Sequence, residues 1–219
     1  MNVSEACQLR ISVRAFRPDP IPGSVVRDIL ELAHRGAPSG GNLQPWRVYA
    51  LGGQDLADFK AEVAGKPLEA AEYDVYPRSL WDPYRRRRYE CGEDLYARLG
   101  IAREDRPARF KQLFRNAEFF GAPAALFFCI DRRLGAPQWA DVGMYMQTVM
   151  LLAVERGLDT CAQEFWAGYA KTVARVLRLP EDFMVFAGMA LGRRDETHRV
   201  NSLRTRREPF EAFAEMRGF

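Results

Sequence analysis

The segment from Ala37 to Trp46 reads APSGGNLQPW, which places two adjacent glycines and two side-chain amides between an expected helix and an expected strand. Glycines allow a backbone to approach a flat ligand closely because they carry no Cβ. Asn42 and Gln44 add donor and acceptor groups that suit the polar edge of an aromatic ring system. A plain helix-to-strand turn explains the glycines and prolines but not the amides. The segment therefore indicates a ligand-binding loop.

Regular elements are predicted on both sides of this loop. Apolar residues recur at helical spacing over residues 25–33, and we expect Ser24 to cap this helix and Gly36 to end it. Residues 46–51 have the composition of a strand, and a further helix is predicted over 55–65.

The second half of the chain carries the most apolar segments. Buried strands are predicted over 122–130 and 183–191, and a short strand or extended turn over 159–165. A long apolar helix is predicted over 140–156 and a shorter helix over 171–178. The final segment, residues 199–219, is expected to begin as a polar arm and to end in a helix. No regular βαβ series occurs, and no G-x-G-x-x-G follows a strand, so a Rossmann dinucleotide site is not supported.

The segment RISVR, residues 10–14, is a candidate anion clamp. In an extended segment, alternation places Arg10, Ser12 and Arg14 on one side. Two guanidinium groups and a hydroxyl match the oxygens of a phosphate. A second basic cluster, NSLRTRR at residues 201–207, is a candidate for completing that site. For each cluster taken alone, a solvated charged surface is the simpler interpretation.

Composition limits the possible functions. The chain has 32 basic and 29 acidic residues, and this balance does not by itself indicate nucleic acid or acidic membranes as partners. Four separated cysteines and two histidines do not support a zinc site, and reduced thiols in the cytoplasm are the simplest interpretation. The N-terminus does not resemble a signal peptide, and the apolar stretch at 143–154 is too short to span a bilayer.

Together these segments resemble the nitroreductase family of flavoproteins. The resemblance lies in R-x-S-x-R near the N-terminus, in APSGGNLQPW, in the Asp-x-Gly and Met-Gln of residues 141–157, and in the basic C-terminal arm. It covers most of the chain, with residues 73–109 as the variable part. It implies a single domain over 1–219 with an α+β fold. In this fold, helices flank a mixed, mainly antiparallel sheet as a three-layer sandwich with an extended C-terminal arm.

The resemblance also implies an FMN site shared by two subunits. Arg10, Ser12 and Arg14 correspond to phosphate and ribityl contacts, and Arg204 and Arg207 to late phosphate contacts, with Arg206 leaving that last match ambiguous. The loop that reaches the flavin, often from the partner subunit, corresponds to Pro38, Ser39, Gly40 and Asn42, next to the amide of Gln44. The backbone near flavin N5 corresponds to Gln163, Glu164 and Phe165. No side-chain nucleophile and no metal are expected.

The activity implied is reduction of nitroaromatic or related electron-poor aromatic compounds. NADH or NADPH would donate a hydride to FMN in a ping-pong mechanism, within a homodimer centred on the long helix. One alternative keeps FMN but changes the chemistry to reductive dehalogenation, quinone or enone reduction, or flavin breakdown. Another is a flavin-binding or nucleic-acid-binding protein without turnover.

The region from Lys66 to about Arg109 is predicted to be an insertion with short helices, because arginine and aromatic residues accumulate there. Its most unusual part is YRRRRY, residues 84–89. A solvated helix face is the favoured interpretation. The second is a lid over the flavin, in which an aromatic substrate stacks on Tyr73, Tyr76, Trp81 or Tyr84 and one arginine binds its carboxylate. The chosen substrate residues are Trp81, Tyr84 and Arg85. A nucleic-acid site is the third.

Overall fold

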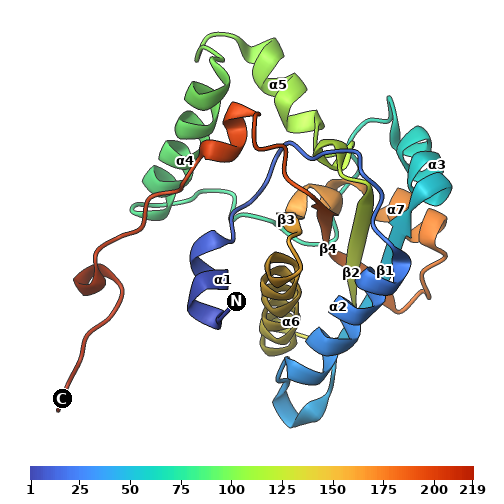
Figure 1. Ribbon diagram of the computed structural model, residues 1–219, viewed down its shortest axis with the longest axis horizontal. Helices are drawn as coiled ribbons and strands as arrows, with labels where there is room; N and C mark the ends of the chain where they lie inside the picture. Colours follow the sequence, from blue (N-terminus) through green and yellow to red (C-terminus); the bar gives the residue numbers. More distant parts are fainter.

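The computed structural model describes residues 1–219 and contains one four-stranded sheet with helices on both faces (Figure 1). The strand order is β1-β2-β4-β3, and all three pairings are antiparallel. An isolated bridge between Ser12 and Thr160 adds a single parallel pairing beside β3. The α+β sandwich expected from the sequence is confirmed. The strands are β1 (Trp46–Gly52), β2 (Ala124–Asp131), β3 (Asp159–Gln163) and β4 (Phe183–Gly192).

One face of the sheet is covered by α2 (Gly23–Gly36) and α6 (Ala136–Glu155). Residues of β2 alternate between the two faces, and Leu126 and Phe128 belong to the core under α2 and α6. The short helix α1 (Val3–Leu9) packs against α6. The long apolar helix predicted over 140–156 is therefore central, as expected.

The opposite face is covered by α3 (Gly53–Val63) and α7 (Ala170–Leu177). Its core is aromatic, since the fully buried Trp166 packs against the rings of Phe59, Phe119 and Phe127. Together, the two cores make the sheet the buried middle layer, which provides a rigid base for the segments at its edges.

The region predicted as an insertion with short helices contains α4 (Tyr84–Leu99), whose 16 residues make it longer than expected, and the next helix is α5 (Arg106–Phe114). No residue of α4 is buried. Arg109 of α5 joins the two helices through hydrogen bonds of 2.6 and 3.0 Å to Glu93, and its guanidinium lies 4.2 Å from the ring centroid of Tyr96. Helix formation here follows good local propensity without an apolar face, which is why periodicity did not reveal it.

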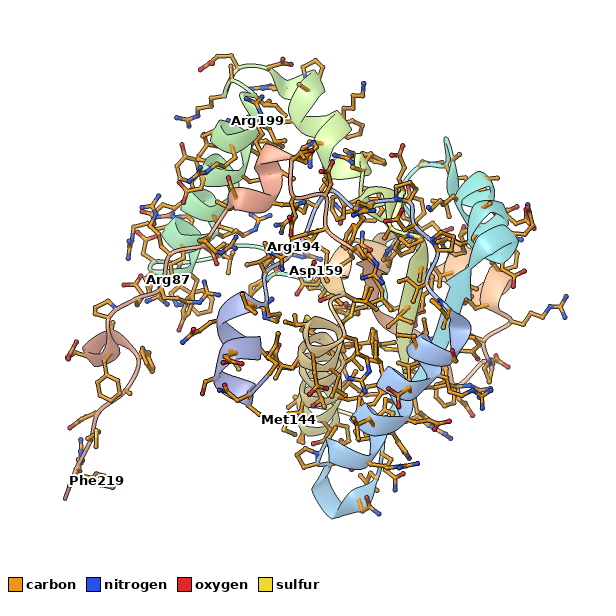
Figure 2. The ribbon with its side chains drawn as sticks, in the orientation of Figure 1. Arg87, Met144, Asp159, Arg194, Arg199 and Phe219 are labelled. Carbon is orange, nitrogen blue, oxygen red and sulfur yellow. The ribbon has the colours of Figure 1, made fainter.

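Two further details differ from the sequence-based expectations. The first is that α2 begins at Gly23 after Pro22, so Ser24 lies inside the first turn and makes no capping bond. The second is that the C-terminal arm does not end in an α-helix. After the short turns at Arg199–Ser202 and Phe210–Ala212, it extends away from the body to Phe219, which is 99% exposed (Figures 1 and 2).

Candidate active site

The candidate anion clamp runs alongside β3. The Val13 N–H donates a 3.0 Å hydrogen bond to the Thr160 carbonyl, and Ile11 and Val13 are buried. Because neighbouring side chains of an extended segment point to opposite sides, Arg10, Ser12 and Arg14 lie on the other side, away from the core. The alternation expected from the sequence is present.

Asn201 connects this segment to the late basic cluster. Its side-chain Oδ1 accepts a 3.0 Å hydrogen bond from the Arg14 N–H, and its Nδ2 donates to the Ala15 carbonyl at 2.8 Å. Arg204 Nη1 donates to the Asn201 carbonyl at 3.1 Å. The role of this buried amide was missed from the sequence, where an asparagine beside a basic cluster is the available signal. The early and late clusters are thus brought together in one chain.

The arginines of the two clusters differ in their electrostatic partners. Arg206 is already paired with Asp94 at 2.9 Å. None of the four arginines expected to contact phosphate forms an ion pair; these four are Arg10, Arg14, Arg204 and Arg207. Guanidinium groups without carboxylates are available for an external anion.

The pKa of Cys161 in β3 is affected by both Arg10 and Arg14. Burial raises the pKa of this thiol, and the positive charges of Arg14 and Arg10 act in the opposite direction. Both guanidinium groups therefore act on the same point of the β3 edge. Arg207 lies in a smaller neighbouring cavity of about 350 Å³ beside α4.

A cavity of about 1010 Å³ lies between this edge and α4. Arg14, Cys161 and Ala162 contribute to its wall, and the rest comes largely from residues 76–80 and from α4. This volume is at the upper end of the range for small-molecule and cofactor pockets, about 300–1,000 Å³.

The residues that follow Ala162 have different environments. Gln163 is buried, and its amide donates to the Asn116 carbonyl at 2.8 Å and accepts from Trp166 Nε1 at 3.3 Å, so its side chain is structural. Phe165 packs among aromatic rings, including Phe114 at 5.7 Å. Glu164 is exposed.

Glu164 lies close to two tyrosines of the preceding insertion. Burial is the main cause that raises the pKa of Tyr73 to about 12, and the Glu164 carboxylate adds to it. The pKa of Tyr76 is raised by burial and by Glu164, while Arg88 opposes this shift. Tyr76 is therefore placed between a carboxylate and a guanidinium at the cavity wall.

The glycine loop lies elsewhere in the chain. The Gly40 N–H donates to Asp141 Oδ2 near the beginning of α6 at 3.2 Å, and the Gln44 N–H donates to Ser39 Oγ at 3.0 Å. Asn42 and Gln44 have φ values of 57° and 49°, which are costly for residues with a Cβ. Pro38 lies in the same exposed loop. The loop is thus held in an unusual conformation at the surface.

The loop and the clamp are well separated in one chain. The loop contacts the start of α6, whereas the clamp pairs with β3 after α6 ends (Figure 1). At about 1.5 Å per helical residue, the distance along α6 is roughly 20 Å. One chain alone does not bring the two predicted halves of the site together.

Only one of the three predicted substrate residues lines the large cavity. Arg85 lines the large cavity. Trp81 and Tyr84 do not; they are exposed and contact each other, with ring centroids 5.6 Å apart. The tyrosines that line the cavity are Tyr76 and Tyr89, which lie in the same tyrosine-rich region.

Comparisons with known proteins identify the family of this chain. The family model "Nitroreductase family" matches residues 8–193. The chain is 37% identical to a 4-nitrobenzoate reductase of Pseudomonas putida, over 96% of this chain and 93% of the relative. It is 36% identical to a nitrobenzene nitroreductase of Ectopseudomonas oleovorans, over 93% of this chain and 92% of the relative.

A solved structure shares the whole fold. The FMN- and NADPH-dependent nitroreductase NfnB from Sphigopyxis sp. strain HMH superposes with a TM-score of 0.95 and 44% identity, covering 100% of both chains. The fold is that of an α+β flavoprotein reductase, and the chain belongs to the nitroreductase family. None of its helices combines the length and apolar character needed to cross a membrane.

Proposed function

We propose that this chain is an FMN-dependent reductase of nitroaromatic compounds that takes its electrons from NADH or NADPH. The observation that carries the proposal is the convergence of Arg10, Ser12, Arg14 and Arg204 beside a large cavity, with no carboxylate paired to these arginines. The relatives that act on nitroaromatic compounds, and the FMN-dependent structure, support the same conclusion.

The donor set fits the chemistry of FMN. Guanidinium groups suit the terminal phosphate, and the exposed hydroxyl of Ser12 suits the polar ribityl chain. When bound, FMN supplies the chemistry that accepts a hydride and passes electrons to the second substrate. The chain binds and orients FMN. The main chain at Gln163, Glu164 and Phe165 comes directly after Cys161 and Ala162 of the cavity wall, and we assign it to the backbone that approaches the flavin.

The separation of loop and clamp is explained if the functional unit is a homodimer. A two-fold axis across α6 would place the start of one α6 near the end of the other, which brings residues 38–44 of one chain to the clamp of its partner. In support, Met144 on α6 is 41% exposed (Figure 2), and the C-terminal arm exposes Phe210 and Phe213. We place this dimer in the cytoplasm.

The decisive experiment mixes the purified protein anaerobically with NADH and with NADPH. We expect a yellow protein with about one FMN per chain that bleaches rapidly with at least one donor and is reoxidised by a nitroaromatic compound. A colourless protein that takes up no added FMN contradicts the proposal. A yellow protein that is not bleached by either donor indicates flavin binding without turnover.

The clamp is tested with Arg10→Ala, Arg14→Ala and Arg207→Ala. A charge-assisted hydrogen bond is worth about 1.5–3 kcal/mol, so each loss should weaken FMN binding by about ten- to a hundred-fold. Arg206→Ala is the matched control, because Asp94 already neutralises that arginine. Unchanged flavin content in all three variants would show that the phosphate site is misplaced.

The shared site is tested by mixing two defective chains. Arg14→Ala impairs the clamp, and Gly41→Val impairs the loop because Gly41 has a φ of 58°, which strains a β-branched residue. In mixed dimers one of the two sites carries neither defect. We expect flavin binding to return on mixing, and light scattering to give a dimer; a stable flavin-loaded monomer contradicts the proposal.

A further inference from the structure

The large cavity carries an excess of positive charge. Four arginines line it, namely Arg14 of the clamp and Arg78, Arg85 and Arg88 of the insertion. The one acidic residue in its lining is Glu93, which is fully engaged by the two hydrogen bonds from Arg109. An anion entering the cavity therefore meets several guanidinium groups, and the carboxylate in the lining is already neutralised; the Glu164 carboxylate acts on Tyr76 but does not belong to the lining.

The four consecutive arginines of α4 have different partners in the folded chain. Arg86 and Arg87 contact Glu208 of the C-terminal arm at 3.3 and 2.8 Å, and neither lines the large cavity. Arg85 lines the cavity and contacts Asp82 at 3.2 Å. Arg88 lines the cavity and forms no ion pair. One turn of helix thus directs two arginines toward the protein's own acid and leaves Arg88 available.

Arg88 is positioned by an aromatic ring. Its guanidinium lies 4.4 Å from the ring centroid of Tyr76, which also lines the cavity. A cation held over an aromatic face keeps its outer N–H groups free for an anion. Arg78 lies near Tyr76 along the chain and makes neither a hydrogen bond nor an ion pair within the protein. Tyr76 adds an apolar ring surface beside both charges.

The relatives leave open whether the acceptor carries a charge. The nitrobenzoate reductase and the nitrobenzene reductase are 37% and 36% identical to this chain, and their substrates differ by a carboxylate. We propose that Arg88, held by Tyr76 and assisted by Arg78, binds the carboxylate of the acceptor, so that this chain prefers nitrobenzoates to neutral nitrobenzenes. This inference rests on the proposed nitroaromatic reductase activity and names the substrate class within it.

The test compares 4-nitrobenzoate with 4-nitrobenzamide, which has the same size and no charge, using the FMN-loaded enzyme. Arg88→Gln should lower kcat/KM for 4-nitrobenzoate by about ten- to a hundred-fold, because one charge-assisted hydrogen bond is lost. The same substitution should change kcat/KM for 4-nitrobenzamide by less than about two-fold. Arg78→Gln should act in the same direction with a smaller effect. Arg88→Lys should recover part of the loss, since it restores the charge but not the guanidinium fork.

Arg86→Gln is the matched control. It removes one arginine from the same helix but none from the cavity. The kcat/KM values for both acceptors should therefore equal those of the enzyme without substitutions. Equal losses on acid and amide in Arg88→Gln would overturn the inference, because a general loss of cavity structure would explain them. The inference would also be overturned if the enzyme without substitutions reduced 4-nitrobenzamide with the same kcat/KM as 4-nitrobenzoate.

Two other anions could use the same arginines, and the same enzyme preparations distinguish them. Loss of FMN from Arg88→Gln would assign Arg88 to the cofactor phosphate. A selective loss of flavin bleaching by NADPH, with NADH unaffected, would assign it to the 2′-phosphate of the donor. Each result overturns the carboxylate site while leaving the reductase activity in place. Absence of bleaching in the unchanged protein would instead contradict the proposed function itself.

Discussion

The sheet core and the α4–α5 hairpin are stabilised by different forces. Every residue of β2 except its last is buried, and its side chains fill the cores on both faces. In α4 no residue is buried, and its contacts to the rest of the chain include ion pairs, such as Arg87 with Glu208 and Arg206 with Asp94, and the cation–π contact of Arg88 with Tyr76. The sheet is therefore held by apolar burial, and the hairpin by polar contacts that exchange easily with water.

This difference indicates that the sheet and the hairpin have different roles in the site. The buried sheet positions β3, and with it the anion clamp, whereas the hairpin supplies the far wall of the cavity. A wall without a buried face can move at low cost when ligands enter or leave. We therefore expect substitutions in the sheet to change global stability and substitutions in the hairpin to change local opening and substrate choice.

The largest effect is expected from Phe127→Ala. Phe127 is 0% exposed and packs against Phe59, Phe119 and Trp166. Truncating such a residue costs about 3–5 kcal/mol of unfolding free energy. The matched control is Phe110→Ala in α5, where the ring is 61% exposed, and it should change stability by less than about 0.5 kcal/mol. Urea denaturation measures both; similar losses in the two variants would show that the hairpin has its own core.

A smaller effect is expected from Gly188→Ala in β4. A Cβ at this position would lie 2.2 Å from Trp166 Cδ1, inside a fully buried ring, so the core must shift. Overpacking of this kind costs about 1–3 kcal/mol. In α4, Gly92→Ala meets no atom within 4 Å and should stabilise the chain by about 0.5–1 kcal/mol through helix propensity. Thermal denaturation giving the same sign for both variants would contradict this contrast.

A pH effect is expected from Tyr145, which packs under the sheet and donates to the Leu30 carbonyl at 3.2 Å. Burial raises its pKa from 10.0 to about 12. Between these values the unfolded chain releases a proton that the folded chain keeps, so the free energy of unfolding falls as pH rises. Below pH 10 this contribution is fully present. Tyr145→Phe should make the fall between pH 10 and pH 12 shallower, measured by urea unfolding at several pH values; an unchanged slope contradicts the prediction.

The smallest global effect is expected from Glu93→Gln, which removes the carboxylate that joins α4 to α5 through Arg109. The melting temperature should remain nearly unchanged, because the two helices reach the sheet cores only at the end of α5. Amide hydrogen exchange should become faster over residues 84–114 only. Glu31→Gln removes the exposed pair with Arg27 on α2, at 3.8 Å, and should leave exchange in the hairpin unchanged. A global loss of protection in Glu93→Gln would show that the hairpin is coupled to the core.

The sequence by itself determined the elements that depend on apolar pattern or on backbone chemistry. Residues 122–130 and 183–191 were predicted as buried strands because apolar β-formers are continuous there, and β2 and β4 occupy these positions. Alternation in RISVR predicted which side chains face away from the core, since it depends only on the two-residue repeat of an extended chain. The loop motif and the two basic clusters pointed to the family, which the family model confirms.

Only the tertiary structure decided which charged groups remain available. Arg85, Arg86, Arg87 and Arg88 are identical in the sequence. Arg85 pairs with the nearby Asp82, whereas the roles of the other three come from Glu208 and Tyr76, which are brought to α4 by folding. Arg206 is excluded from the anion clamp for the same reason, because Asp94 lies beside it. Local pattern cannot reveal such pairings, since an ion pair or a cation–π contact between distant residues leaves no periodicity in the chain. The separation of the glycine loop from the clamp along α6 has the same origin, because the length of a packed helix determines it.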